Sequence, residues 1–383
     1  MENLIYFDNS ATTKPHPEVI ESFAKVSANY FANSSSIHPL GGQVEKLLEA
    51  ARQQAADLIG VSKETIIFTS GGTEGNNTAI KGVALEHQSR GKHIITTQAE
   101  HPSIHDTCRS LEKLGFEITY MPVAEDGTVS AADVENSIRK DTILVTMMQV
   151  NNEIGSIQPI EEIGNVLKKH PKVLFHVDAV QGLGKVPLNL SDTGIDLCTF
   201  SGHKIHGLKG TGLLYVNHTA KLYPLLHGGS QESGIRSGTE NVAGAVSFVK
   251  ALRLIKEKQD IQKNNILKTL HDKLMKELSQ LEGIEINSPA GGANHIIHFS
   301  VPGIKPEVII HSLSQKEIYI STKSACSSRD LTESHVLVAC GKTKEVSSSG
   351  LRVSFSYENK EEEVDIFVKE IKKAIQQFKE VLR

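Results

Sequence analysis

Short apolar runs alternate with helical stretches over residues 42–216, and this alternation constrains the fold more than any other feature. The runs lack the polar alternation of a half-exposed strand, and stretches with helical periodicity, such as 42–59, separate them. Strands of a parallel sheet show this pattern because helices cover both faces of the sheet. We therefore predict an α/β fold with a largely parallel sheet flanked by helices. The predicted strands are 65–69, 93–97, 116–121, 142–150, 173–178, 197–200 and 212–216.

The composition and the pattern of apolar residues change after about residue 240. A long helical region is rich in Lys, Leu, Gln and Glu, shorter mixed elements follow it, and an amphipathic helix is predicted over 360–382. We interpret this part as a second, smaller α+β domain to which the N-terminal residues return. The predicted division is 15–250 for the large domain, and 1–14 together with 251–383 for the small domain.

Composition excludes several classes of protein. Of the 383 residues, 39% are hydrophobic and 22% are charged, which is typical of a globular protein and not of a disordered chain. The net charge of −4 predicts no general affinity for nucleic acid, and no apolar run is long enough to span a membrane. Residues 1–13 do not resemble a secretory signal. We expect a soluble, cytoplasmic protein that makes no direct contact with nucleic acid or a membrane.

A glycine-rich segment, 69–74 (TSGGTE), lies between a predicted strand and a predicted helix. Glycines let backbone amides approach a ligand, and the N-terminus of a helix favours an anion. The segment therefore indicates a phosphate-binding turn, although an ordinary tight turn between a strand and a helix would look the same. It matches neither a Walker loop nor a dinucleotide-binding fingerprint.

Three chemistry-bearing side chains follow other predicted strands, where ligands of such sheets bind: His101, Asp178 and Lys204. His101 and His105 are four residues apart, but no further ligand has convincing spacing, so we predict no metal site. A lysine among glycines is poorly explained by packing or solubility. A phosphate-binding turn, an acid and a lysine in this order suit pyridoxal 5'-phosphate (PLP), whose aldehyde forms a Schiff base with a lysine and whose pyridine nitrogen pairs with a carboxylate.

The whole chain resembles the cysteine desulfurases, which belong to the class V aminotransferase superfamily of PLP fold-type I. This resemblance implies a mostly parallel, seven-stranded-type sheet flanked by helices, with a smaller α+β domain. The motifs that carry it are YFDNSATT (6–13), TSGGTEGNN (69–77), AEHPS (99–103), VNNEIGSIQPI (150–160), HVDAVQ (176–181), SGHKIHGLKGTG (201–212), RSGTEN (236–241) and SACSS (324–328).

The resemblance also implies a role for each matching residue. Lys204 would form the Schiff base, Asp178 would pair with the pyridine nitrogen, and His101 would stack on the ring. Asn152 and Arg352 would hold the carboxylate of the amino-acid substrate, since a guanidinium suits a carboxylate. Thr239 would complete the phosphate site of a partner subunit, which implies a homodimer. The remaining predicted cofactor ligands are Gly72 and Thr73 and, beyond them, Gln181, Ser201 and His203.

Cys326 lies in a small, polar stretch that suits an exposed, mobile loop, predicted over about 321–333. The resemblance makes its thiolate the nucleophile that takes sulfur from L-cysteine, which leaves L-alanine and a persulfide on Cys326. We assign Cys108, Cys198 and Cys340 to packing, because the four separated cysteines make neither a disulfide framework nor a zinc site. Three alternatives are a selenocysteine lyase, a class V aminotransferase, and a non-catalytic adaptor that docks sulfur acceptors.

The persulfide sulfur would pass to an acceptor protein for tRNA thiolation or for iron–sulfur assembly. We expect an enzyme that thiolates tRNA, because the chain has only the helical pattern after residue 360, whereas iron–sulfur members of the family carry a further tail. Lys323 precedes SACSS where a glycine or serine is common in the family, and Ser230 and Ser233 depart from the family pattern in GGSQESGIRSGT. These departures concern the choice of partner more than the chemistry.

Overall fold

The computed structural model describes residues 4–261, 266–322 and 333–381. Seven strands form one sheet in the order β2-β8-β7-β6-β5-β3-β4. The neighbours from β7 to β4 pair in parallel, and β8 pairs antiparallel with both β2 and β7. The predicted mostly parallel sheet is therefore confirmed. Its strands are β2 (Ile66–Thr69), β3 (His93–Thr97), β4 (Glu117–Met121), β5 (Thr142–Met148), β6 (Leu174–Asp178), β7 (Leu197–Ser201) and β8 (Gly212–Val216).

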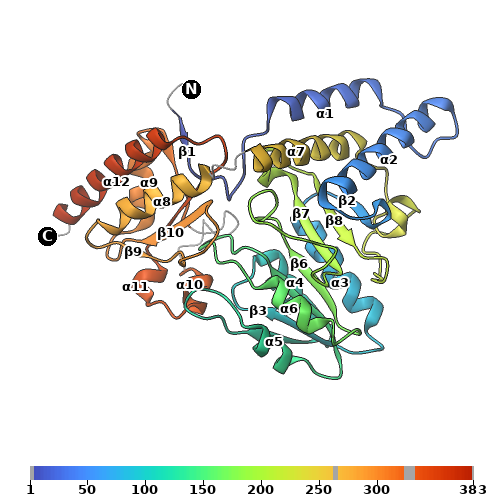
Figure 1. Cartoon of the computed structure of the whole chain (residues 1–383), viewed down its shortest axis with the longest axis horizontal. Helices are drawn as coiled ribbons and strands as arrows, with labels where there is room; N and C mark the ends of the chain where they lie inside the picture. The colour runs from blue at the N-terminus through green and yellow to red at the C-terminus, as the bar shows by residue number, and fades with distance from the viewer. Residues whose placement is uncertain (1–3, 262–265, 323–332, 382–383) are drawn as a thin grey trace.

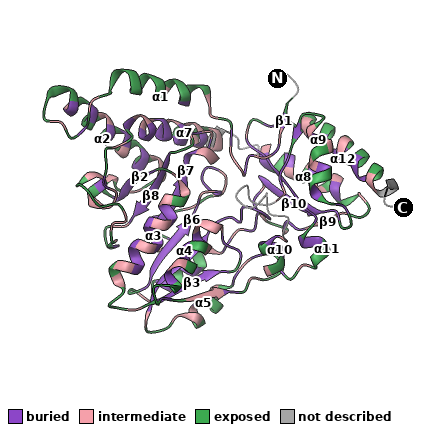
Figure 2. Cartoon of the chain, turned by 180° about the vertical axis from the view of Figure 1, so that it is seen from behind, coloured by how far each residue is buried: buried purple, intermediate pink, exposed green. Residues whose placement is uncertain are grey.

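Both faces of this sheet are buried, as the unbroken apolar runs predict. On β5, for example, Leu144 and Val145 belong to different core clusters on opposite faces, because successive strand residues point to opposite sides. Figure 2 shows that the strands of this sheet are buried, whereas the surrounding helices carry intermediate and exposed residues. The helices of this part are α1 (Pro17–Asn29), α2 (Pro39–Ile59), α3 (Gly72–His87), α4 (Pro102–Glu112), α5 (Ala131–Ser137), α6 (Ile160–Leu167) and α7 (Val242–Ile261).

Two helix ends follow directly from the sequence. The helix predicted over 42–59 is α2, and Gly60 closes it in the left-handed conformation (φ 74°) that glycine adopts without strain. Helix α4 begins with Pro102, and His101 is its N-cap residue, accepting a hydrogen bond from the amide of Ser103. The end of α4 that follows β3 is thereby fixed at the edge of the sheet where the predicted site residues lie.

A second hydrophobic cluster lies beyond α7 and is built around a three-stranded antiparallel sheet, β12-β10-β9. Ile5 and Phe7 of the N-terminal segment pack into this cluster, with buried residues between Leu267 and Ile375 (Figure 1). The separation of this cluster from those that cover the seven-stranded sheet supports the predicted division at about residue 250, which falls inside α7 and remains a prediction. The elements are β1 (Ile5–Tyr6), α8 (Ile266–Ser279), β9 (Glu285–Ile286), β10 (Ile296–Ser300), α9 (Pro306–Ser314), β11 (Ile318–Tyr319), α10 (His335–Ala339), α11 (Lys344–Ser347), β12 (Gly350–Ser354) and α12 (Glu361–Val381).

Among the described residues, no helix combines the length and the apolar character that crossing a bilayer would require.

Candidate active site

A cavity of about 710 Å³ opens at the carboxyl ends of β5, β6 and β7, against the N-termini of α3 and α4. The cavity brings together most of the predicted site residues, although they are far apart in the sequence. It is lined by Ser10, Ala11, Gly72, Thr73, Asn76, His101, Ser103, Met148, Val150, Asn152, Asp178, Val180, Gln181, Ser201, His203, Lys204 and Arg352.

Asp178 is the last residue of β6, and its carboxylate is held by two hydrogen bonds. The side-chain amide of Asn76 donates to Oδ2 at 2.7 Å, and the backbone amide of Val180 donates to Oδ1 at 2.9 Å. Burial raises the pKa of Asp178, while these hydrogen bonds and the nearby Lys204 ammonium lower it in part. Asn76, from the first turns of α3, was not among the predicted ligands, although it lies in the motif that contains the glycine-rich turn.

Lys204 ends the short 3-10 turn Gly202–Lys204 that follows β7. Its ammonium donates to the backbone carbonyls of Ser10 and Ala11, the latter at 2.9 Å. The backbone carbonyl of Lys204 accepts a hydrogen bond from the side chain of Lys185 at 3.1 Å. The predicted lysine therefore reaches the N-terminal segment across the cavity, a contact that no local pattern in the sequence predicts.

His101 lies at the wall of the same cavity, and its Nδ1 is 2.8 Å from the hydroxyl of Ser103. Burial lowers the pKa of His101 to about 4, and the Lys204 ammonium adds to this effect. The imidazole is therefore neutral over the physiological range. The preceding residue, Glu100, is fully buried and accepts hydrogen bonds from Thr97 and from the amide of Met148, and burial raises its pKa to about 8.

The glycine-rich turn brings backbone amides to the cavity wall. Gly71 has a φ of 146°, which only glycine adopts readily, and α3 begins at Gly72. A Cβ atom on Gly72 would lie 2.9 Å from Val180 Cγ2, so a larger residue would disturb the wall of the cavity. The hydroxyl of Ser201 is buried next to the turn and has no hydrogen-bond partner within the described parts of the chain. These features suit a bound anion.

Arg352 reaches the cavity from β12, and its side chain is 1% exposed. Its Nη1 donates to the backbone carbonyl of Asn152 at 2.7 Å, and its Nη2 donates to Asp8 Oδ1 at 3.0 Å. The two predicted carboxylate-binding residues are therefore adjacent. Asp8 was missed as an individual residue, although the motif YFDNSATT contains it.

The remaining predicted residues have different outcomes. Thr239 is exposed and does not line the cavity of its own chain. Cys326 lies outside the described residues, but residues on both sides of that stretch touch the site. Ser321 exchanges two backbone hydrogen bonds with Arg352, and His335 Nε2 is 3.0 Å from the backbone carbonyl of Glu100.

The other three cysteines are buried, in agreement with the predicted packing role. Burial raises the pKa of Cys108 to about 12 and that of Cys340 to about 11, which disfavours the reactive thiolate at neutral pH. Over the described ranges, no group of three or more His, Cys, Asp or Glu side chains is arranged to hold a metal ion.

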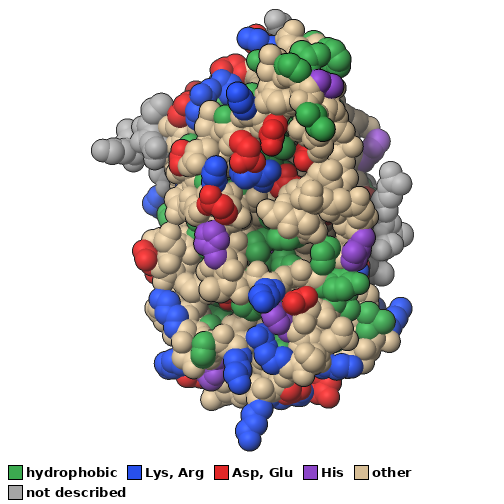
Figure 3. Space-filling view, turned by 90° about the vertical axis from the view of Figure 1, so that its right-hand side faces the viewer, with side chains coloured by type: hydrophobic (Ala, Val, Ile, Leu, Met, Phe, Trp, Pro, Cys, Tyr) green, Lys and Arg blue, Asp and Glu red, His purple; other side chains and the backbone are tan. Residues whose placement is uncertain are grey.

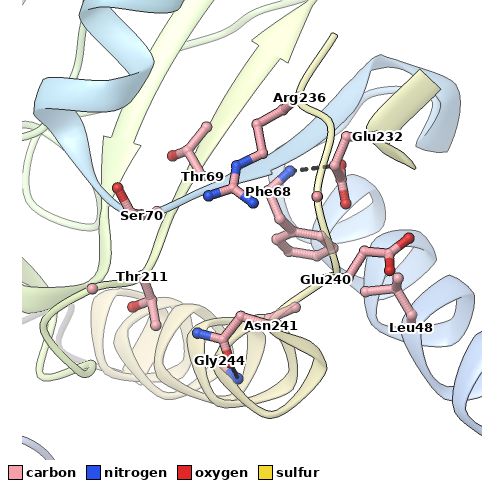
Figure 4. Close-up of a pocket in the computed structure, with 14 residues that line it drawn as sticks. Leu48, Phe68, Thr69, Ser70, Thr211, Glu232, Arg236, Glu240, Asn241 and Gly244 are labelled. Atoms are coloured by element: carbon pink, nitrogen blue, oxygen red, sulfur yellow. Dashed lines mark hydrogen bonds between the residues drawn. The ribbon is translucent and has the colours of Figure 1, made fainter. Parts of the chain in front are cut away.

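A second cavity, of about 520 Å³, lies beside the glycine-rich turn, between the end of β2, segment 231–241 and the N-terminus of α7 (Figure 4). Arg236 points into it, and its Nε donates to Glu74 Oε1 at 2.9 Å. From the same segment, the carboxylate of Glu232 accepts a hydrogen bond from the amide of Phe68 at 2.9 Å. Two acidic side chains therefore anchor the segment that contains Thr239.

Comparison with known proteins agrees with this arrangement. The model of the family described as "Aminotransferase class-V" matches residues 5–367. The chain belongs to this family. Class V aminotransferases are PLP-dependent enzymes, and the glycine-rich turn, Asp178 and Lys204 fit this cofactor because they offer an anion site, a buried acid and an amine around one cavity.

Several members of the class V family resemble the chain over nearly its full length. A NifS/IcsS protein homolog of Lactobacillus delbrueckii subsp. bulgaricus is 45% identical, with 99% of each chain covered. Cysteine desulfurase IscS of Methanosarcina thermophila is 42% identical over 98% of this chain and 93% of its own. Among solved structures, a NifS-like protein has a TM-score of 0.91 at 36% identity, with 97% of this chain and 99% of its own covered. The structure described as SspA in complex with cysteine has a TM-score of 0.81 at 34% identity, covering 92% of this chain and 98% of its own.

Proposed function

We propose that the chain is a PLP-dependent cysteine desulfurase, which converts L-cysteine to L-alanine and leaves a persulfide on Cys326. The observation that carries the proposal is the single cavity that joins Lys204, Asp178, His101 and Arg352 in a class V aminotransferase. Relatives named cysteine desulfurase and a similar structure in complex with cysteine support the choice of substrate.

The cavity residues would divide the binding of the cofactor among them. Lys204 would bond its aldehyde carbon, Asp178 would face the pyridine nitrogen, and His101 would lie on the ring. Gln181 would hydrogen-bond the ring hydroxyl, and Asn152 would contact the cofactor as well as the substrate. The phosphate would be held by Gly72, Thr73, Ser201 and His203, together with Thr239 of a second subunit. When bound, PLP supplies an electron sink for the pair released at the substrate Cα.

The residues of the chain would then do the following. Arg352 and Asn152 hold the substrate carboxylate, and the Lys204 amine takes the Cα proton. His101 lines the cavity as a neutral imidazole, and it is the residue that would accept the thiol proton of the substrate. The Cys326 thiolate attacks the substrate sulfur, the C–S bond breaks with its electron pair left on the carbon, and Cβ takes a proton to become the methyl group of alanine. A proton returns to Cα before alanine leaves, so that the proton taken by Lys204 is restored.

A direct experiment tests this reaction. Purified protein is incubated with PLP, L-cysteine and a reductant, and the alanine and sulfide released are measured. We expect the two products in equal amounts. A keto acid without sulfide would instead favour an aminotransferase. A much higher rate with selenocysteine than with cysteine would favour a selenocysteine lyase.

A homodimer is the proposed assembly. Thr239 is exposed, and large apolar side chains are exposed between α1 and α2 and in the first turn of α2: Phe31 is 77% exposed, Ile37 is fully exposed and Leu40 is 51% exposed. Figure 3 shows hydrophobic side chains near the top of the face at the β2–β8 end of the molecule, and a second group near its middle. Apolar groups of this kind are typical of a protein interface. Sedimentation equilibrium should give twice the chain mass, and Ile37→Glu should weaken the association.

For the final acceptor, we propose a dedicated cytoplasmic protein that thiolates tRNA, ahead of a scaffold for iron–sulfur clusters. Lys323 and Arg329 on either side of Cys326 in the sequence suit an acidic docking surface. Persulfide-loaded protein with labelled sulfur should transfer the label to such an enzyme. Deletion of the gene should lower thiolated nucleosides in bulk tRNA while iron–sulfur enzymes stay active, and the reverse result would contradict this choice.

A further inference from the structure

The N-terminal segment Asp8–Thr13 leads from the hydrophobic cluster around the sheet β12-β10-β9 to the active-site cavity, and its contacts fix the position of Asp8. Asp8 forms a β-bridge with Ser354, two residues after Arg352 on β12. The side-chain amide of Asn9 donates to the carbonyls of Tyr6 and Ser354, both at 3.0 Å. Strand β12 therefore positions both Arg352 and the backbone of Asp8, and the two side chains meet at 3.0 Å.

Asp8 neutralises a guanidinium that has little access to solvent. Arg352 is 1% exposed, whereas the Asp8 side chain is 21% exposed. A buried cation requires an opposite charge or hydrogen bonds. Asp8 provides the charge, and the carbonyl of Asn152 accepts a hydrogen bond from Nη1. Burial raises the pKa of Asp8, whereas Arg352, the Lys204 ammonium and a hydrogen bond with Ser321 lower it in part. Asp8 therefore faces both cations of the cavity.

We propose that Asp8 is the resident counter-ion of Arg352 and, as a positioning residue, limits how tightly the site binds the carboxylate of its substrate and product. This inference rests on the proposed role of Arg352. Two carboxylates beside one guanidinium repel each other, so the charge of Asp8 must weaken binding of a second carboxylate. The same repulsion favours release of alanine, which has the same carboxylate as cysteine. Asp8 thus keeps Arg352 in place between turnovers and prevents the product from remaining bound.

The test uses two inhibitors that differ only in charge. 3-Mercaptopropionate carries the carboxylate and thiol of cysteine but no amine, so it does not react with the cofactor; 3-mercaptopropionamide is its neutral counterpart. In the PLP-loaded protein, Asp8→Asn keeps an oxygen that can accept the Arg352 hydrogen bond while it removes the charge. We expect the inhibition constant of the acid to fall by about three- to tenfold, the size of a unit charge a few ångströms away in a partly solvated site. We expect the inhibition constant of the amide to stay the same.

Asp57→Asn, an exposed residue of α2, is the matched control and should change neither inhibition constant. If Asp8→Asn is not recovered folded, Asp8→Ser removes the same charge and takes its place. Equal changes for acid and amide, or no tightening of the acid, would overturn the proposal. Failure of the desulfurase proposal shows separately, as absence of alanine and sulfide from the unchanged protein. In that event both affinities are read by calorimetry, which needs no turnover.

Discussion

The ion pair between Arg52 and Glu232 makes a sharp prediction about stability. Arg52 Nη1 and Nη2 donate to the two oxygens of Glu232 at 2.8 and 3.0 Å, and the side chains are 11% and 3% exposed. Glu232 also accepts from the amide of Phe68, directly before the glycine-rich turn. Removal of one partner of such a pair leaves an uncompensated charge in the interior. The perturbation is therefore Glu232→Ala.

The contacts of Arg52 that remain set the size of the effect. Loss of one partner from a buried pair costs about 3–5 kcal/mol in the free energy of unfolding. Arg52 would keep hydrogen bonds to the carbonyl of Ile66 and to Glu49, which is 47% exposed, so the lower limit applies. We expect a loss of about 3 kcal/mol, or a fall of about 1 M in the urea midpoint if the denaturant slope is about 3 kcal/mol/M.

Far-UV circular dichroism follows the unfolding, since the chain contains no tryptophan for fluorescence. The control is Asp272→Ala, which removes an exposed pair with Lys268, where the side chains are 56% and 59% exposed. Such a pair contributes about 0.5 kcal/mol or less. A midpoint for Glu232→Ala within 0.2 M (roughly 0.6 kcal/mol) of the control would refute the argument that burial makes this ion pair important.

Four further predictions concern the cavity. Lys204→Ala should remove both the covalent, borohydride-reducible cofactor and all activity; a cofactor still attached would show that another lysine binds it. Cys326→Ser should bind PLP normally but release neither sulfide nor alanine, and normal turnover would exclude the persulfide step. The His101 ring should titrate near pH 4 in NMR spectra, since burial and then Lys204 disfavour its charged form; titration near 6.5 would contradict this. Gly72→Ala should lower the affinity for PLP measured by equilibrium dialysis, because the new Cβ would lie too close to Val180. An unchanged affinity would show that Val180 can move to accommodate the methyl group.

The sheet and its covering helices could be predicted because each strand appears in the sequence as a short apolar run between stretches with helical periodicity. Each of the seven predicted strands lies within two residues of an observed one at both ends. The burial of both faces leaves an unbroken apolar run that helical or half-exposed segments do not show. The turn at Gly60 was predictable for a similar reason, since its left-handed conformation favours glycine strongly. These features depend on neighbours in the sequence.

Asp178 and Lys204 were also predictable, because parallel strands end at one edge of the sheet and their last residues converge there. Asp8 was not, since its contact with Arg352 joins residues 344 positions apart. That contact exists only because the N-terminal segment bridges β12. The partnership of Asn76 with Asp178 likewise depends on how α3 packs against the sheet. Partners brought by a distant element leave no periodic signal in either segment.

Glu100 shows why the chemical state of a site residue needs the structure as well as its position. Like Asp178, it is a buried acid near the end of a strand, but no role was predicted for it from the sequence. Glu100 accepts from Thr97 and from the amide of Met148, and a pKa of about 8 leaves it mostly protonated at neutral pH. Burial also raises the pKa of Asp178, and hydrogen bonds from Val180 and Asn76 and the nearby Lys204 ammonium lower it in part. The two buried acids therefore differ in their charged neighbours: the Lys204 ammonium lowers the pKa of Asp178, whereas the Asp178 carboxylate raises that of Glu100.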